Sequence, residues 1–212
     1  MRAITKGQEP PSLTTHRQTA GSNYGNYMGK DELRRALVTE QRGLCCYCMD
    51  RIHDDGSTRI EHWRPQSRCP DLQLVYRNLL AACHGGKGPK AKQHCDARKG
   101  DQDLLWNPAD PTRRVEARIR YGVVDGSIWS DDEAFNAELD DVLNLNLPTL
   151  RGRRKGMIDG IAEWYKKTRG RSGARSRLQS QRERWLPAYG ELEPFCQVAV
   201  WAVDQRLSRL GQ

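Results

Sequence analysis

Seven cysteines, four of them in two spaced pairs, constrain the fold of this 212-residue chain more than any other feature. The first pair is Cys45 and Cys48, and a C-x-x-C turn lets two thiolates reach one metal ion at ~2.3 Å each. The second pair is Cys83 and Cys95, which have eleven residues between them. Four thiolates leave no open coordination position for a substrate, so the spacing predicts a structural zinc ion.

Neighbouring side chains could take part in the same metal site. His84 and His94 adjoin the second cysteine pair and compete for its coordination positions, and Cys46 and Cys69 are further candidate ligands. Cys46 should point away if the C-x-x-C pair converges on one ion. A thioredoxin-like redox pair is the other interpretation, but such a pair follows a strand and precedes a helix, and here the predicted order is reversed.

The composition favours a cytoplasmic protein with a polyanionic partner. No run of apolar residues approaches the ~20 needed to span a bilayer, and residues 1–15 lack the apolar segment of a secretory signal. Glutathione keeps cytoplasmic thiols reduced, which disfavours disulfides as the explanation of the cysteines. The net charge of +8 favours nucleic acid as the partner. The alternative is a basic surface that only maintains solubility.

The order of predicted elements indicates an α+β fold in three parts. Residues 1–28 contain prolines and glycines with little periodicity, which is typical of an extended N-terminal arm. Residues 29–101 should form a compact core, and residues 102–212 a mainly helical extension. In the core, a helix is expected to begin with Asp31 as its cap and to end at about Arg42. The other expected core elements are strands at 51–52 and 58–62 joined by a turn at 54–56, a partly helical stretch at 72–82 and a short helix at 94–99.

The helical extension is predicted from periodicity and from turn signals. A hairpin over 118–128 should turn at Asp125-Gly126. The expected helices cover residues 131–144, 149–169, 176–187 and 192–209, with a joint at 170–176. Residues 151–187 hold twelve basic and three acidic side chains, so this stretch is either a nucleic-acid face or a partner face. Its candidate phosphate contacts are Arg153, Arg154 and Lys155.

Polar residues follow a distinctive order between and after the cysteine pairs. The sequence reads Ile60-Glu61-His62-Trp63-Arg64-Pro65, with Asn78 sixteen residues after His62, and Asp96-Ala97-Arg98-Lys99-Gly100 directly after Cys95. This order resembles the HNH endonucleases, whose motif has C-x-x-C, an acidic or histidine residue followed by His, then Asn, and then Cys followed by Asn or His and a Lys. The resemblance implies a zinc-stapled ββα-metal nuclease core that hydrolyses nucleic-acid phosphodiesters.

The resemblance also implies a role for each motif residue. His62 would be the general base, for which a pKa of ~6.5 is suitable, and Asn78 would fix the loop and orient His62. Glu61 and Asp96 would bind the catalytic divalent cation, and two carboxylates suit Mg²⁺ or Mn²⁺. Asp96 departs from the family pattern, in which this position is usually Asn or His. The basic residues expected to hold phosphates are Arg64 and Lys99.

A closer resemblance extends over roughly residues 25–170. Its segments, in order, are Tyr76-Arg77-Asn78-Leu79-Leu80-Ala81-Ala82-Cys83-His84, His94-Cys95-Asp96, Lys99-Gly100-Asp101, Trp106-Asn107-Pro108 and Leu143-Asn144-Leu145-Asn146, with Leu150 and Arg154. The chain is thereby similar to HNH nucleases found with retrons and Septu anti-phage systems, in which the nuclease subunit PtuB works with an ABC/SMC-type ATPase, PtuA. The Leu-Asn-Leu-Asn segment also fits an amphipathic helix end with Asn caps.

This resemblance implies an ATPase partner for the chain. The sequence has no Walker A motif, G-x-x-x-x-G-K-[ST], so ATP control must come from another protein. The extension at 102–212 is the expected docking surface, with Trp164, Trp185 and Trp201 as candidate contacts. The alternative is that it packs against the apolar back of the nuclease core. The leading prediction is an HNH endonuclease that cleaves DNA as the effector of an anti-phage defence system.

Two non-catalytic alternatives stay open. The chain could be a zinc-containing module that binds nucleic acid without cutting it, or a scaffold that recruits the ATPase with a degenerate nuclease site. Asp96 in place of Asn or His is the feature that favours a degenerate site. The combination of Glu61, His62 and Asp96 favours cleavage, because binding alone needs no such cluster.

Overall fold

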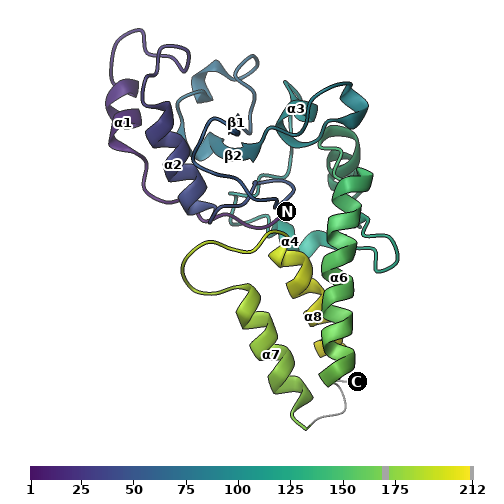
Figure 1. Ribbon diagram of the computed structural model, residues 1–212. Coiled ribbons are helices and arrows are strands. Elements are labelled where there is room, and N and C mark those ends of the chain that lie inside the picture. The colour runs from purple at the N-terminus through teal and green to yellow at the C-terminus, as the bar shows by residue number, and fades with distance from the viewer. Residues whose placement is uncertain (169–171, 211–212) are drawn as a thin grey trace.

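The computed structural model describes residues 1–168 and 172–210, and it has a mixed α+β architecture. Two small antiparallel sheets lie in the first two thirds of the chain. In Figure 1, helices α6 (Pro148–Thr168), α7 (Ala174–Trp185) and α8 (Cys196–Arg209) extend away from the N-terminal part of the molecule. The predicted α+β class with a helical C-terminal part is confirmed.

The N-terminal segment is partly helical and packs against the rest of the protein. Residues Pro11–Arg17 form helix α1, so the prediction of an extended arm over 1–28 is wrong there. A proline at the start of a helix is favourable because that position needs no N–H partner. Leu13 is fully buried, and the Ile4 N–H donates to the Pro108 carbonyl at 2.8 Å. Tertiary contacts, which sequence periodicity does not reveal, therefore hold this segment.

Helix α2 (Lys30–Glu40) lies close to where the sequence predicted it. Its cap position is Gly29 rather than Asp31, which lies in the first turn. A carboxylate there still interacts favourably with the positive end of the helix dipole. The buried residues of this helix are Leu33, Leu37 and Val38.

The first sheet pairs strand β1 (Thr58–His62) with strand β2 (Leu79–Cys83) in antiparallel register. The predicted hairpin between 51–52 and 58–62 is therefore wrong, and Arg51 forms an isolated bridge with Leu44 instead. Strand β2 is an apolar run whose first four residues are buried. Pairing of β1 with β2 buries more apolar surface than pairing with the short segment 51–52 would.

The chain between β1 and β2 is mostly irregular, with 3-10 turns η1 (Pro70–Leu72) and η2 (Tyr76–Asn78). The prediction of a partly helical stretch at 72–82 therefore holds only for its first half. After β2, a loop with the short turn η3 (Lys90–Lys92) leads to helix α3 (Cys95–Lys99). Strands β1 and β2 and helix α3 thus follow one another in strand–strand–helix order.

The second sheet is the predicted hairpin, formed by β3 (Ile119–Tyr121) and β4 (Ile128–Ser130). The Asp132 carboxylate accepts a hydrogen bond from the Phe135 N–H at 2.9 Å and caps the helix that follows. The neighbouring elements are α4 (Val115–Arg118), α5 (Glu133–Ala137) and the π-helical turn η4 (Glu138–Val142).

Helices α6, α7 and α8 form a bundle in which α8 packs against both others. Ile161, Leu178 and Val203 are buried in a small core between them. Trp164, Trp185 and Trp201 pack against this core, so these tryptophans contribute to packing within the chain. Residues 170 and 171 of the predicted joint, and residue 169 at the end of the predicted helix 149–169, lie outside the described residues. No helix in the described part of the chain is both long and apolar enough to cross a membrane.

Candidate metal centre and active site

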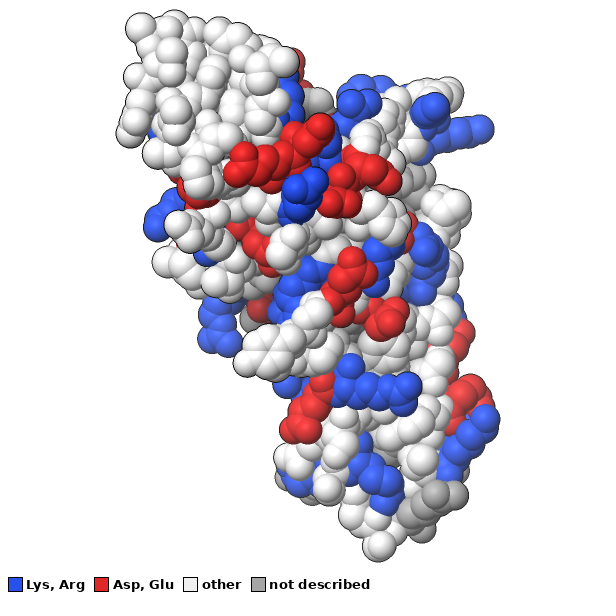
Figure 2. Space-filling view, turned by 60° about the vertical axis from the view of Figure 1, so that its left-hand side comes forward, with Lys and Arg blue, Asp and Glu red and all other residues white. Residues whose placement is uncertain are grey.

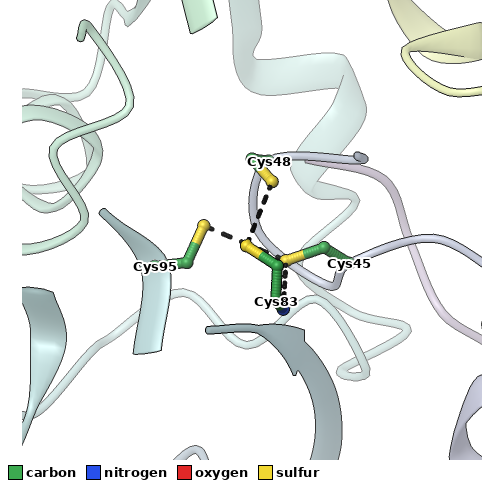
Figure 3. Close-up of side chains that lie close together, drawn as sticks. All are labelled: Cys45, Cys48, Cys83 and Cys95. Carbon is green, nitrogen blue, oxygen red and sulfur yellow. Dashed lines mark hydrogen bonds between the residues drawn. The ribbon is translucent and has the colours of Figure 1, made fainter. Parts of the chain in front are cut away.

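The four cysteines predicted to bind zinc meet in one place, and their sulfur atoms lie within 4.8 Å of one another. Figure 3 shows Cys45, Cys48, Cys83 and Cys95 converging from different parts of the chain. The Sγ atoms of Cys48 and Cys83 are 3.7 Å apart, and those of Cys45 and Cys95 are 3.9 Å apart. Tetrahedral zinc with Zn–S distances of ~2.3 Å requires S–S distances of about 3.8 Å, so the cluster fits zinc.

Three elements supply the cluster. Cys45 and Cys48 lie in the turn after α2, Cys83 ends β2 and Cys95 begins α3. Two backbone N–H groups donate to the sulfurs. The N–H of Cys83 is 3.3 Å from Cys45 Sγ, and the N–H of Asp50 is 3.4 Å from Cys48 Sγ. Hydrogen bonds of this kind orient metal ligands, and a bound ion would crosslink the turn, the strand and the helix.

The other candidate zinc ligands lie outside this set of four. His94 Nδ1 is 3.2 Å from Cys95 Sγ and 3.9 Å from Cys83 Sγ, so the imidazole adjoins the cluster. His84 lies within hydrogen-bond distance of the Gly86 carbonyl instead. Among the described residues, the four cysteines alone form a group of three or more potential metal-binding side chains at this spacing. The thiols outside that group include Cys46 and Cys69.

A close backbone contact shapes the loop between Cys83 and Cys95. The His94 N–H donates to the Gly85 carbonyl at 2.8 Å, and Gly85 has a φ of +80°. A Cβ atom at Gly85 would lie 1.7 Å from the His94 carbonyl oxygen. Glycine is therefore required for the approach that brings the two cysteines together.

The Leu-Asn-Leu-Asn segment holds this loop from the other side. The Asn144 side-chain amide donates to the carbonyls of Gln93 at 2.8 Å and Ala91 at 3.2 Å. The Cys95 N–H donates to the Leu143 carbonyl at 3.0 Å. Asparagine at position 144 therefore has two roles, because its left-handed backbone (φ of +50°) ends the turn η4 (Glu138–Val142) and its side chain clamps the cysteine loop.

Asn146 and Arg154 form a second clamp, on the β3–β4 hairpin. Asn146 accepts a hydrogen bond from the Ile128 N–H at 2.9 Å and donates to its carbonyl at 3.0 Å. The Arg154 guanidinium donates to the carbonyls of Gly126 at 2.7 Å and Leu145 at 2.8 Å, and the side chain is buried. The prediction that Arg154 contacts phosphate is therefore wrong, because its donors are used inside the protein.

Glu61, a predicted ligand of the catalytic cation, is buried near the end of β1. Its Oε1 accepts a hydrogen bond from the Tyr47 hydroxyl at 2.9 Å and lies 2.7 Å from Lys99 Nζ. Burial, with a smaller contribution from the nearby Asp96 carboxyl group, raises the pKa of Glu61 to about 8 against the opposing effect of Lys99. Asp96, the other predicted carboxyl ligand, therefore lies close enough to Glu61 to affect its pKa.

His62, the predicted general base, is also largely buried. Its Nε2 lies 3.0 Å from the Gln73 carbonyl, and because a carbonyl only accepts, Nε2 must carry the proton. Nδ1 is then an acceptor, and it lies 3.3 Å from the Gln66 side-chain nitrogen. The ring of Tyr24 packs against the imidazole edge-on, with 4.6 Å between centroids. Burial lowers the pKa of His62 to about 4, so the ring is neutral.

Asn78 closes the loop between β1 and β2. Its side-chain oxygen accepts a hydrogen bond from the Arg64 N–H at 2.8 Å, and its amide donates to the carbonyls of Arg64 and Leu72 at 3.0 and 3.1 Å. The loop thus has the clamp that the sequence predicted. The ring of His62, however, is oriented by the Gln73 carbonyl and not by Asn78.

Lys99 has a different position from the predicted one. Its side chain is 1% exposed, and Nζ donates to the His62 carbonyl at 2.9 Å as well as approaching Glu61. An ammonium group enclosed in this way cannot reach a phosphate in this conformation. The predicted phosphate contact through Lys99 is therefore wrong for this structure, and the residue belongs to the surroundings of Glu61.

The remaining predicted phosphate ligands stay near the surface. Arg64 stacks on the Trp63 ring at 4.5 Å and pairs with Asp103. Arg153 pairs with Asp50 and Lys155 with Asp159. On the face drawn in Figure 2, the upper-left part of the molecule is mostly uncharged, and basic and acidic side chains are interleaved over the rest. The basic excess of the sequence therefore does not gather into one patch on that face.

Four residues of the site were not found from the sequence. Tyr47 is enclosed by the C-x-x-C turn, and this position inside the motif is a signal that could have identified it. Gln66 and Gln73 lie in an irregular loop, and Tyr24 lies in the segment predicted to be an extended arm. The Tyr24 N–H donates to the Gln73 side chain at 3.0 Å, which ties that segment to the site. No local pattern marks these last three positions.

Comparison with known proteins gives one distant relative. No known protein-family model matches the chain. The Septu protein PtuB of Bacillus thuringiensis is 28% identical to it over 87 residues. The match covers 41% of this chain, and the chain spans only 30% of the length of that relative. The predicted similarity to PtuB is thereby confirmed as a distant one, and the HNH and retron parts of the prediction remain predictions.

Proposed function

We propose that this protein is a metal-dependent HNH endonuclease that hydrolyses DNA phosphodiesters in an anti-phage defence system. The observation that supports the proposal best is the contact of β1 with α3, in which Lys99 approaches both the Glu61 carboxylate and the His62 carbonyl, while Cys83 of β2 and Cys95 of α3 belong to the four-cysteine cluster. In this proposal, residues 29–101 form the nuclease core. The similarity to PtuB, a Septu protein, supports the role in defence.

The carboxyl groups of Glu61 and Asp96 fit a divalent cation. They come from a strand and a helix, and the proximity of Asp96 contributes to the raised pKa of Glu61. Two neighbouring carboxylates repel each other when both are ionised, and a divalent cation between them would relieve that repulsion. Oxygen ligands of this kind suit Mg²⁺ or Mn²⁺. When bound, such an ion supplies Lewis-acid stabilisation of the departing 3′-oxygen.

His62 would accept the proton of the attacking water at Nδ1. The Gln73 carbonyl holds the opposite nitrogen, Nε2, in its protonated form, which keeps the lone pair on Nδ1. Because burial lowers the pKa of His62, the imidazole is neutral at physiological pH, as a base must be. The Gln66 side chain lies at Nδ1, where the water would bind, and would have to move aside.

The surface basic residues are the proposed substrate contacts. Arg64 lies two residues after His62, and its stacking on Trp63 fixes a guanidinium close to the base. Arg153 and Lys155 remain candidates, since exposed ion pairs are worth little and can be exchanged for phosphate contacts. Nucleic-acid phosphates would then be held by Arg64 in the proposed nuclease core (29–101) and by Arg153 and Lys155 in the extension (102–212).

The extension at 102–212 is the proposed docking site for an ABC/SMC-type ATPase similar to PtuA. The tryptophans predicted as contacts are used for packing inside the bundle. Other large apolar side chains of the extension are exposed, and Val124 is 83% exposed. Exposed apolar groups that pack against nothing within a chain are the better candidates for partner contacts. Further examples are Val123, Trp129 and Tyr189.

A non-catalytic zinc module is the second candidate function. The observation that favours it is the ion pair between Lys99 and Glu61, which engages one oxygen of a proposed metal ligand. Such a protein would bind nucleic acid, or recruit the ATPase, without cutting.

A nicking assay on supercoiled DNA, with a parallel RNA substrate, separates the two candidates. With Mg²⁺ or Mn²⁺ the wild-type protein should cut DNA, and His62→Ala should lose ~10²–10⁴-fold in rate. His53→Ala, which removes an exposed histidine before β1, is the matched control and should cut normally. Full activity of His62→Ala would contradict the proposed mechanism. Nucleic-acid binding without cleavage by the wild type in either metal would favour the non-catalytic module.

A further inference from the structure

Two donors from different elements meet on a single oxygen of Glu61. The Tyr47 hydroxyl is 2.9 Å from Oε1, and Lys99 Nζ is 2.7 Å from the same atom. We infer that Tyr47 and Lys99 are positioning residues, which hold Glu61 by Oε1 so that Oε2 is the oxygen presented to the cation. This inference rests on the proposed function of Glu61 as a metal ligand.

Burial makes this arrangement specific. Tyr47 is 0%, Lys99 1% and Glu61 4% exposed, so none of the three groups can replace its partner with water. A carboxylate with both donors on Oε1 has one rotational setting in which the hydrogen bonds are kept. The second oxygen, Oε2, is thereby held in one orientation, in which it can serve as the metal ligand.

The cysteine cluster determines where both donors lie. Tyr47 stands between Cys45 and Cys48, and Lys99 closes the five-residue helix that begins with Cys95. The Lys99 ammonium also donates to the His62 carbonyl at 2.9 Å, so one group holds the backbone of the base and the side chain of the metal ligand. The structural zinc site would therefore set the geometry of the catalytic site through these two side chains.

A direct measurement of Mn²⁺ affinity tests the inference without any cleavage assay. Tyr47→Phe removes one hydroxyl and should weaken Mn²⁺ binding by ~10-fold or more. The affinity is measured by electron paramagnetic resonance on the zinc-loaded protein. The matched control is Tyr76→Phe, which removes a hydroxyl that donates to Glu40 at 2.7 Å, away from the site. The control should bind Mn²⁺ as the wild type does.

A double-mutant cycle shows whether Tyr47 acts through Glu61. Glu61→Gln alone should weaken Mn²⁺ binding, and adding Tyr47→Phe to it should cause no further loss. Lys99→Met should also weaken binding, and if that variant does not fold, the Tyr47 cycle still decides the matter. Unchanged Mn²⁺ affinity in Tyr47→Phe, or losses that add in the double variant, would overturn the inference.

The same measurements separate this inference from the proposed function. If the wild type binds no Mn²⁺ and Glu61→Gln changes nothing, the proposed metal site is wrong and the inference falls with it. If the wild type binds Mn²⁺ and Glu61→Gln weakens it while Tyr47→Phe does not, only the positioning role is wrong.

Discussion

The Asn144 clamp on the cysteine loop gives the most quantitative test of how this chain holds its metal. Asn144 donates to two loop carbonyls, of which the Gln93 contact is partly buried and the Ala91 contact exposed. It also has a φ of +50°, in the left-handed region that asparagine tolerates better than most residues. Two substitutions separate these contributions.

Asn144→Gly removes the side-chain hydrogen bonds but suits the backbone conformation. At about 0.5–1.5 kcal/mol per hydrogen bond, with the exposed Ala91 contact at the low end of that range, the expected loss in the free energy of unfolding is about 1–2 kcal/mol. Asn144→Ala removes the same bonds and adds the left-handed backbone cost of about 1–2 kcal/mol, giving about 2–4 kcal/mol in total. Urea denaturation of the zinc-loaded protein measures both differences.

The rate of zinc release should rise in the same order, with Asn144→Ala releasing zinc faster than Asn144→Gly and both faster than the wild type. If the loop must open before a chelator reaches the ion, a loss of about 1–2 kcal/mol accelerates release about 5–30-fold. The matched control is Asn146→Ala, which removes two similar hydrogen bonds from Ile128 on the hairpin and leaves the loop untouched. Equal release rates for the Asn144 and Asn146 variants would refute the clamp.

Four further measurements test other parts of the structure. Cys95→Ser should lose the bound zinc in metal analysis and unfold in part, because a bound structural ion contributes folding free energy; zinc-free wild type of equal stability would contradict this. Gly85→Ala should lower zinc occupancy, since its Cβ would meet the His94 carbonyl; normal occupancy would show that the loop can rearrange. Arg154→Met should lower the unfolding midpoint and leave the salt dependence of DNA binding unchanged, whereas a slope reduced by ~0.9 would make it a phosphate contact after all. Val124→Asp should weaken co-purification with a co-expressed ATPase and keep zinc content, and an unaffected complex would exclude this surface.

The metal cluster was the part of the site that the sequence could predict best. Cys45 and Cys48 form a C-x-x-C turn, and Cys83 and Cys95 supply a second pair with eleven residues between them. Thiolates in a reduced protein have few other roles. The pairing partner of β1 was not predictable in the same way. The turn signal at 54–56 is local, whereas the strand that pairs with β1 begins seventeen residues after it ends and is favoured by burial. Sequence periodicity reports on neighbours along the chain and not on such distant partners.

The N-terminal segment shows the same limitation at the site itself. Prolines and glycines over 1–28 indicate a lack of regular structure, but they do not show where the chain lies. In the structure, Tyr24 rests on the His62 imidazole and its N–H is tied to Gln73. An irregular segment can thus complete a site when its hydrogen bonds are made with another irregular segment.

Charge was the feature most easily misinterpreted from sequence, because a basic residue shows its charge in the sequence but not its burial. Lys99 and Arg154 were both predicted to hold phosphates, and both are 1% exposed. Burial of a charge is costly unless its donors are satisfied, and here the partners are carbonyl groups at loop ends and, for Lys99, the Glu61 carboxylate. Lys99 therefore holds strand β1, which carries Glu61 and His62 of the proposed active site, and Arg154 holds the β3–β4 hairpin. If the protein cleaves DNA, part of its basic excess serves to build the site, and the phosphates must be bound by the arginines and lysines that remain at the surface.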